Sequence, residues 1–181
     1  MSYYVVVRGP LAVGKTTVCE RLAGVLRADH ISIDRILEEY GLEEWDEDRI
    51  SLRSFLRANA IAADQARRSF ERGSPVLFDG CFYWRQQIHD LVERVHAPHY
   101  VFRLKAPLAV CIARDRTRPR TPTGATPKGG DQLGEEAARD VYRLVSQVRS
   151  GVPIDASGPV EATVNAILVH LPKLPPGRVV R

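Results

Sequence analysis

One stretch near the start of the chain, Gly9-Pro10-Leu11-Ala12-Val13-Gly14-Lys15-Thr16, constrains the fold more than any other. It fits the pattern G-x-x-x-x-G-K-[ST] without a substitution. It also lies between an apolar run, 3–7, that predicts a strand and a segment, 17–27, that predicts a helix. Gly9 and Gly14 can take backbone angles closed to other residues, so the loop can curl with successive N–H groups pointing inward as an anion nest. A simple glycine turn would need neither the second glycine nor the lysine.

This loop predicts a site for nucleotide phosphates. The helix that follows adds its unpaired amides and the positive end of its dipole. Lys15 is expected to reach the β- and γ-phosphates of ATP, and the Thr16 hydroxyl to ligate Mg²⁺. The residues of this stretch expected at the nucleotide are Gly9, Ala12, Val13, Gly14, Lys15, Thr16 and Thr17.

Composition limits what can surround this loop. The 181 residues, 44% of them hydrophobic, suit one α/β domain over residues 1–171 with a frayed tail, 172–181. The chain runs directly into its first strand and has no apolar stretch of membrane-spanning length, so we expect a soluble, cytoplasmic protein without membrane contact. Three scattered cysteines without a C-x-x-C motif predict buried thiols, not a disulfide framework or zinc site: Cys19, Cys81 and Cys111.

The net charge of +4 is unevenly distributed along the chain. Residues 1–100 carry 13 basic and 15 acidic groups, a net −2, whereas residues 101–181 carry 13 and 7, a net +6. The second half is therefore expected to face phosphate. Its basic residues are not interleaved with aromatic ones and no DNA- or RNA-binding motif is present, so nucleic acid is not an expected partner.

A first carboxylate, Asp34, follows a predicted second strand, 30–33. Ligands of open parallel sheets bind beyond the carboxyl ends of the strands, so Asp34 is expected to point into the same crevice as Lys15. Phosphoryl transfer to a hydroxyl needs an acceptor for the hydroxyl proton, and an aspartate suits that role. Asp34 can also serve as the N-cap of a helix that begins at Arg35, and the two roles are compatible.

A second carboxylate, Asp79, ends the predicted buried strand 75–80. This is where a Walker-B carboxylate would orient Mg²⁺ and its water, although an aspartate before glycine is also common in turns. Between the two carboxylates, seven acidic residues within 38–48 predict either a solvated loop or an acidic rim that attracts a cationic acceptor. A long helix is expected at about 48–72. The aromatic cluster 82–84 can pack against the acceptor or belong to the core.

An arginine-rich segment marks the second half. Arg114, Arg116, Arg118 and Arg120 precede a run, 121–130, rich in proline, glycine and threonine, which predicts a mobile lid at about 114–131. Such a lid would bring positive charge to the γ-phosphate and exclude water, although arginines also suit a helix end through the helix dipole. A helix at about 133–148 is expected to bury Leu133, Ala137, Val141, Leu144 and Val148.

The order of these elements resembles the small P-loop kinases: adenylate, shikimate and gluconate kinases, chloramphenicol phosphotransferase and the kinase domain of polynucleotide kinases. The resemblance covers residues 3–171, and its supporting motifs are 31–34, 114–116 and 155–158. It implies a doubly wound α/β fold with a five-stranded parallel sheet of order 2-3-1-4-5. It also implies Asp34 as catalytic base, Arg114 near adenine, Arg118 as a phosphate-binding lid residue and a loop beside adenine. That loop contributes Asp155, Ser157 and Pro159.

We therefore expect an ATP-dependent kinase that transfers the γ-phosphoryl group to a hydroxyl of a small neutral or cationic molecule. Gly80 stands alone where shikimate kinases carry a glycine pair, and the acidic run 38–48 would repel a nucleic-acid strand. The alternatives are a polynucleotide 5′-hydroxyl or nucleotide kinase, a regulatory P-loop ATPase and a zeta-toxin-like kinase of a nucleotide sugar. The protein is expected to be a monomer or a homodimer.

Overall fold

The computed structural model describes residues 3–46, 49–122 and 130–172. Its centre is a parallel sheet in the order β2-β5-β1-β6-β7, which is 2-3-1-4-5 when only these strands are numbered along the chain, as predicted. The strands are β1 (Tyr4–Arg8), β2 (Asp29–Ser32), β5 (Val76–Gly80), β6 (His99–Lys105) and β7 (Val152–Asp155).

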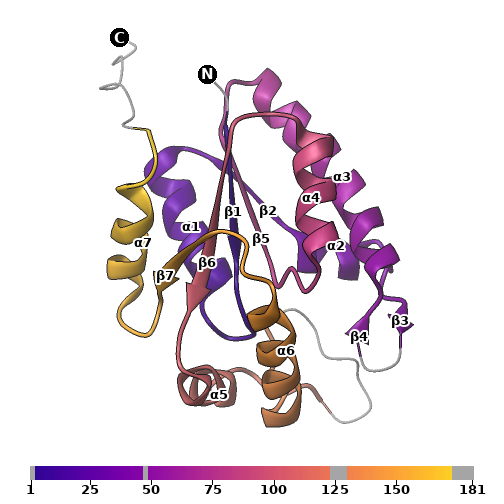
Figure 1. Ribbon diagram of the computed structural model, residues 1–181, viewed down its shortest axis with the longest axis vertical. Helices are drawn as coiled ribbons and strands as arrows, with labels where there is room; N and C mark the ends of the chain where they lie inside the picture. Colours follow the sequence, from indigo (N-terminus) through magenta and orange to yellow (C-terminus); the bar gives the residue numbers. More distant parts are fainter. Residues whose placement is uncertain (1–2, 47–48, 123–129, 173–181) are drawn as a thin grey trace.

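Helices cover both faces of the sheet (Figure 1). One face carries α1 (Lys15–Leu26) and α7 (Val160–Leu168), and the other carries α2 (Ile33–Glu39), α3 (Leu52–Glu71) and α4 (Arg85–Val95). The remaining two helices are α5 (Leu108–Arg116) and α6 (Glu135–Gln147). They lie at the edge of the sheet formed by the carboxyl ends of the strands. The predicted doubly wound α/β fold is therefore confirmed.

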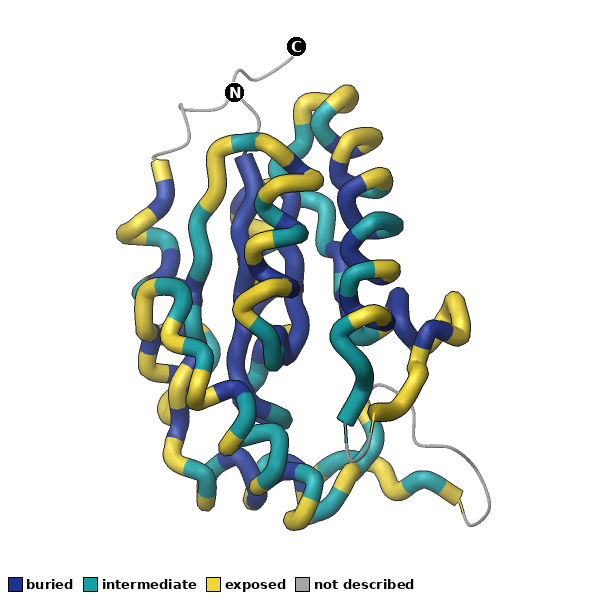
Figure 2. The backbone as a smooth tube through the Cα atoms, turned by 45° about the vertical axis from the view of Figure 1, so that its right-hand side comes forward, coloured by how far each residue is buried: buried dark blue, intermediate teal, exposed yellow. Residues whose placement is uncertain are grey.

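The central strand β1 is buried on both sides because it lies between β5 and β6 with helices above and below (Figure 2). Its side chains alternate between two cores. Val5 and Val7 pack with α1 and α7, whereas Tyr4 and Val6 pack with α2, α3 and α4. Burial of apolar side chains on both faces thus fixes β1 and the loop that leaves it.

The acidic run forms structure that the sequence did not indicate. Its end pairs as an antiparallel hairpin of β3 (Trp45–Asp46) and β4 (Arg49–Ile50). The next helix, α3, begins at Leu52 and not near residue 48, because Ser51 is its N-cap and accepts a hydrogen bond from the amide of Ser54.

The predicted inner face of α6 is correct only in part, because Ala137, Val141, Leu144 and Val148 are half-buried and the most buried residues are their neighbours. Leu133 precedes the helix and is 43% exposed, while the fully buried residues of α6 are Ala138 and Val145, seven positions apart on one face. The helix starts at Glu135 because the amides just before it are held by another side chain, described below, and this start sets its phase.

Two further expectations fall partly outside the described residues. The predicted lid, 114–131, begins on α5, which continues to Arg116, and residues 123–129 lie outside the description. Of the predicted tail, only Pro172 is described. None of the described helices is long and apolar enough to cross a membrane.

Candidate phosphoryl-transfer site

The loop between β1 and α1 has the backbone geometry that its glycines predicted. Gly14, the N-cap of α1, is left-handed with φ 103°, and Ala12 also has a positive φ of 56°. A Cβ on Gly9 would lie 2.9 Å from the carbonyl oxygen of Leu104, so the close approach of the loop to β6 requires glycine there. The result is a turn whose last residues open α1, the geometry of an anion-binding helix start.

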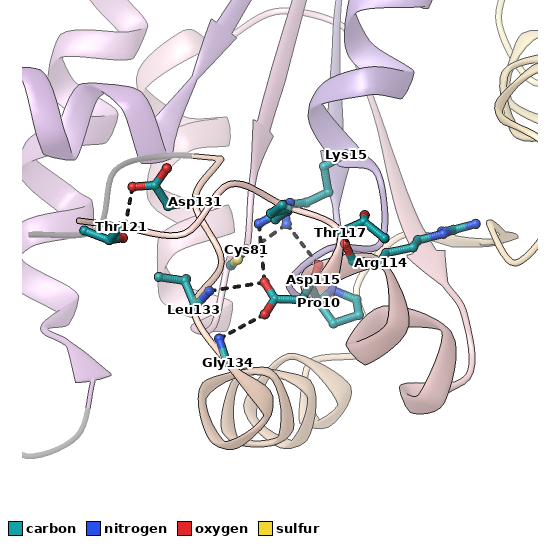
Figure 3. A network of polar contacts seen from close by, with 11 residues as sticks. Pro10, Lys15, Cys81, Arg114, Asp115, Thr117, Thr121, Asp131, Leu133 and Gly134 are labelled. Carbon is teal, nitrogen blue, oxygen red and sulfur yellow. Dashed lines mark hydrogen bonds and ion pairs between the residues drawn. The ribbon is translucent and has the colours of Figure 1, made fainter. Parts of the chain in front are cut away.

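Lys15 is buried at the centre of this region. Its Nζ donates to the carbonyl oxygen of Pro10 at 3.0 Å and lies 3.5 Å from the Sγ of Cys81 (Figure 3). Burial acts to lower the pKa of Lys15, but the nearby Cys81, Asp34 and Asp79 outweigh it, and the pKa is raised. The lysine therefore stays charged in a buried position, a point charge available to an anion.

Asp79, at the end of β5, is held on both carboxylate oxygens. The hydroxyl of Thr16 donates to Oδ2 at 2.7 Å, and Nε2 of His30 lies 3.1 Å from Oδ1. Burial alone would raise the pKa of Asp79, but the bonds from His30 and Thr16 and the charge of Lys15 lower it, so the group is a carboxylate. The turn interpretation of Asp79 is wrong, because the residue is inside the strand.

A hydroxyl and a carboxylate are the hard oxygen donors that Mg²⁺ accepts. No group of three or more His, Cys, Asp or Glu side chains among the described residues could hold a metal ion by itself.

Asp34 lies in the first turn of α2, but it is not the N-cap. Ser32 occupies that position and its Oγ accepts from the amide of Arg35 at 3.4 Å, so the N-cap interpretation of Asp34 is wrong. The backbone of Cys81 is near enough to act on the pKa of this carboxylate, which it lowers. Burial, aided by the charges of Asp79 and Glu43 and opposed by Lys15, raises the pKa of Asp34 to about 6. A carboxylate with this pKa can hold and release a proton near neutral pH.

The aromatic cluster packs with the core around α3 and α4, one of the two predicted roles. Phe82 is fully buried in the core, whereas Tyr83 and Trp84 are half-buried. The Tyr83 ring packs edge-on against Phe55 with 5.3 Å between ring centroids, and the Arg49 guanidinium lies 5.9 Å from the centroid of the Trp84 ring. Burial, and to a lesser degree Cys81 and Asp34, raise the pKa of Tyr83. Tyr83 thus joins the neighbourhood of Asp34 and Cys81.

Arg114 joins the phosphate loop to the loop after β7. Its guanidinium donates to the carbonyl oxygens of Val13 at 3.1 Å, Ala156 at 2.8 Å, Ser157 at 3.2 Å and Gly158 at 3.3 Å. In the same loop, Oδ1 of Asp155 accepts from the amide and the hydroxyl of Ser157, and Pro159 is the N-cap of α7. The Arg114 side chain therefore links the loop 155–159, which was predicted to lie beside adenine, to the phosphate loop.

The described arginines at the end of α5 and just after it have acidic and polar partners. Arg118 lies 3.9 Å from Asp115, Arg116 pairs with Glu135 at 2.9 Å, and Nε of Arg120 donates to Gln132 at 3.3 Å.

Asp115 was missed by the sequence reasoning, which concentrated on the arginines beside it. Its buried carboxylate accepts from the amides of Leu133 at 3.3 Å and Gly134 at 2.9 Å, and so fixes the start of α6 (Figure 3). The hydroxyl of Thr121 donates to Oδ2 of Asp131 at 3.1 Å, so a second hydrogen bond joins the segment after α5 to the segment before α6. The alternation of arginine with one aspartate at the end of a helix was the only signal available.

Together the 2-3-1-4-5 sheet, the loop 9–16 and the Thr16–Asp79 pair define a P-loop nucleotide-binding protein with the fold of the small kinases. The sequence profile of a family described as an AAA domain (AAA_33) matches residues 5–139, and the chain belongs to this family. No curated protein matches the sequence.

Solved kinases share the fold at low sequence identity. A sugar kinase from a Janibacter species superposes with a TM-score of 0.68 and 16% identity over 93% of this chain and 94% of its own. A gluconokinase from Sinorhizobium meliloti gives 0.63 and 17% over 92% and 89%. Shikimate kinase from Aquifex aeolicus gives 0.58 and 13% over 92% and 94%. The predicted resemblance to small P-loop kinases is confirmed at the level of the fold.

Proposed function

We propose that the protein is an ATP-dependent kinase that transfers the γ-phosphoryl group to a hydroxyl of a small molecule, with Asp34 as general base. The observation that supports this most is that Lys15 and Asp34 both lie near Cys81. Nζ of Lys15 lies 3.5 Å from the Cys81 thiol, and the charge of Lys15 and the backbone of Cys81 both lower the pKa of Asp34. A cation for phosphate and a base of pKa about 6 therefore face one small region.

In this proposal the amides of the loop 9–17 and Lys15 bind the phosphates, and Arg114 with the loop 155–159 lies beside adenine. Thr16 and Asp79 would hold Mg²⁺, directly or through water, because they offer a hydroxyl and a carboxylate at the start of α1. The metal would supply positive charge to the oxygens of the β- and γ-phosphates when bound. Arg118, beside the buried Asp115, is the described lid arginine proposed to face phosphate.

The reaction then follows from these positions. As the acceptor hydroxyl oxygen bonds to the γ-phosphorus, Asp34 takes the hydroxyl proton and the bond between the γ-phosphorus and the β,γ-bridging oxygen breaks. ADP leaves with that oxygen. Lys15 offsets the charge on the transferred group, and the buried site limits the water that could compete with the acceptor.

The acceptor proposed is hydroxylated and neutral or cationic. The carboxylate of Glu43 raises the pKa of both Asp34 and Tyr83, so two acidic side chains face the acceptor side. Carboxylates bind hydroxyl or ammonium donors and disfavour anions. The half-buried rings of Tyr83 and Trp84 offer apolar faces to the same ligand. The three solved structures with this fold are named as a sugar kinase, a gluconokinase and a shikimate kinase, which supports a hydroxyl acceptor.

The test is an acceptor screen with ATP and Mg²⁺ against nucleosides, sugars, sugar acids, aminoglycosides and a 5′-hydroxyl oligonucleotide, followed by detection of the phosphorylated product. Lys15→Ala serves as the matched inactive variant, with an expected loss of about 10³-fold or more in transfer. A hit among neutral or cationic compounds supports the proposal. Phosphorylation of the oligonucleotide alone would favour a polynucleotide kinase, and acceptor-independent hydrolysis alone would favour a regulatory ATPase.

A further inference from the structure

His30 lies on the edge strand β2 and reaches the buried Asp79 on the neighbouring strand β5. In the register of these strands His30 is opposite Leu77, which packs in the core with side chains of α1. Because side chains alternate along a strand, Asp79, two positions after Leu77, projects to this same face. Nε2 of His30 lies 3.1 Å from Oδ1 of Asp79, and the hydroxyl of Thr16 donates to Oδ2 at 2.7 Å. One carboxylate thus joins a histidine of β2 to the first turn of α1.

The charge of Asp79 fixes the direction of both hydrogen bonds. A carboxylate can only accept, so Nε2 of His30 and the hydroxyl of Thr16 each carry the donated proton. In the neutral imidazole the single proton is therefore on Nε2, and Nδ1 is the acceptor. Since the Thr16 proton is directed at Asp79, both lone pairs of the Thr16 oxygen point elsewhere. Thr16 is exposed whereas Asp79 is 1% exposed, so these lone pairs are the accessible end of the hydrogen-bonded series.

Loss of the imidazole would change the other end of this series. Among the described residues, His30 is the hydrogen-bond partner of Oδ1, and a buried carboxylate oxygen without a partner is costly. The carboxyl group would turn or take up a proton to recover a partner. Turning moves Oδ2 away from the Thr16 hydroxyl, and a protonated carboxyl group can donate to the Thr16 oxygen and occupy a lone pair. Either change makes Thr16 a poorer ligand for a cation.

We propose that His30 is a positioning residue for the cation that accompanies the nucleotide phosphates. By fixing the Asp79 carboxylate, it keeps the Thr16 proton on the Asp79 side and leaves the Thr16 oxygen open to Mg²⁺. The inference rests on the proposed function for the metal, whereas the direction of the two hydrogen bonds does not. In metal sites generally, removal of a group that orients a ligand lowers metal affinity or activity by about 10- to 100-fold.

The first test measures the binding of a non-hydrolysable ATP analogue, with Mg²⁺ and in excess EDTA, by isothermal titration calorimetry. His30→Leu removes the donor, so Kd for the analogue with Mg²⁺ should rise by about 10-fold, while Kd in EDTA should change by less than about threefold. His30→Gln should stay within about threefold of the wild type in both, because its amide nitrogen can donate in place of Nε2. A folded His30→Leu protein with wild-type Mg²⁺ dependence would overturn the proposal. An equal loss with and without Mg²⁺, which a merely structural role predicts, would overturn it too.

The matched control is His89→Leu. His89 also faces a carboxylate, with Nδ1 3.5 Å from Glu93, but this pair is exposed on α4. The control should keep both affinities, and an equal loss of Mg²⁺ dependence in the two leucine variants would contradict a specific role for His30. If the wild type itself binds the analogue equally with Mg²⁺ and in EDTA, the metal site of the proposed function fails, and this role of His30 fails with it.

The proton order is measured on the wild type without nucleotide or metal, so this test does not depend on the folding of a variant. ¹⁵N NMR distinguishes a ring nitrogen that carries a proton from one that does not, and correlations to the backbone identify the His30 ring. Nε2 of His30 should carry a proton whether the ring is neutral or charged. A His30 ring protonated on Nδ1 alone would overturn the proposal, whatever the acceptor screen finds.

Discussion

The hydroxyl of Thr16 donates a hydrogen bond of 2.7 Å to the carboxylate of Asp79, and it joins the first turn of α1 to the end of β5. The two residues are 63 positions apart in the sequence and meet because β5 is the strand next to β1. His30, from β2 on the other side of β5, holds the second oxygen of the same carboxylate. Side chains from α1 and β2 thus orient one buried carboxylate of β5 at the start of a helix.

This arrangement predicts that Asp79→Asn acts on the metal-bound form of the nucleotide. The amide keeps the shape of the carboxylate but removes its charge, so affinity for Mg²⁺·ATP should fall by about 10-fold or more, while affinity for ATP in excess EDTA should change little. Isothermal titration calorimetry with and without Mg²⁺ measures both. Equal Mg²⁺-dependent affinity in the wild type and the variant would show that Asp79 does not serve the metal.

Arg114 should matter for nucleotide affinity and little for the transfer step. Its guanidinium fixes Val13 of the phosphate loop against the loop 156–158, so Arg114→Met should raise KM for ATP by about 10-fold and reduce kcat less. Arg116→Met is the matched control on the same helix, because Arg116 makes only an exposed ion pair with Glu135, of the kind that contributes little to stability. Initial rates at varied ATP concentration give KM and kcat for both variants. A larger rise in KM for ATP in Arg116→Met than in Arg114→Met would contradict the role proposed for Arg114.

The raised pKa of Asp34 has a consequence for stability. Folding shifts this pKa from 3.8 to about 6, so between these values the folded state holds the proton more tightly and stability falls as pH rises. Above pH 6 the buried charge costs up to about 3 kcal/mol relative to low pH. Asp34→Asn does not titrate, and its stability relative to the wild type should therefore increase between pH 4.5 and pH 7.5. Urea unfolding at the two pH values measures this, and a constant difference would contradict the raised pKa.

The sequence was most informative where local chemistry determines structure. The loop 9–16 and the strand order followed from glycine positions, apolar runs and the family resemblance. The two carboxylates lie near the strand ends expected for them, Asp34 just beyond β2 in α2 and Asp79 next to the last residue of β5. Details that depend on contacts between distant segments were not predictable. Ser32 and Asp34 are both residue types that favour the N-cap position, and in the structure Ser32 occupies it.

Arg8 and Asp115 show the same limit more clearly. In the sequence each is an ordinary charged residue, and only the fold brings Arg8 to the carbonyls of α6 and Asp115 to the amides before it. The error in the inner face of α6 has the same origin, since Asp115 fixes where that helix starts. Burial of a charged side chain depends on partners more than 15 residues away, which periodicity cannot reveal.

The central claim is that Asp34 takes the proton of an acceptor hydroxyl. Asp34→Asn keeps the size of the side chain and should bind an ATP analogue as the wild type does, because Lys15 and Thr16 are untouched. Acceptor-dependent kcat should fall by about 10² to 10⁴-fold, and the wild-type kcat/KM should rise with pH through about 6 as Asp34 ionises.

The direct measurement follows labelled γ-phosphate into the acceptor and into inorganic phosphate in parallel, for both proteins. The predicted result is transfer to the acceptor that is lost in Asp34→Asn, with nucleotide affinity retained. Transfer at the wild-type rate by a folded Asp34→Asn protein would contradict the proposed mechanism.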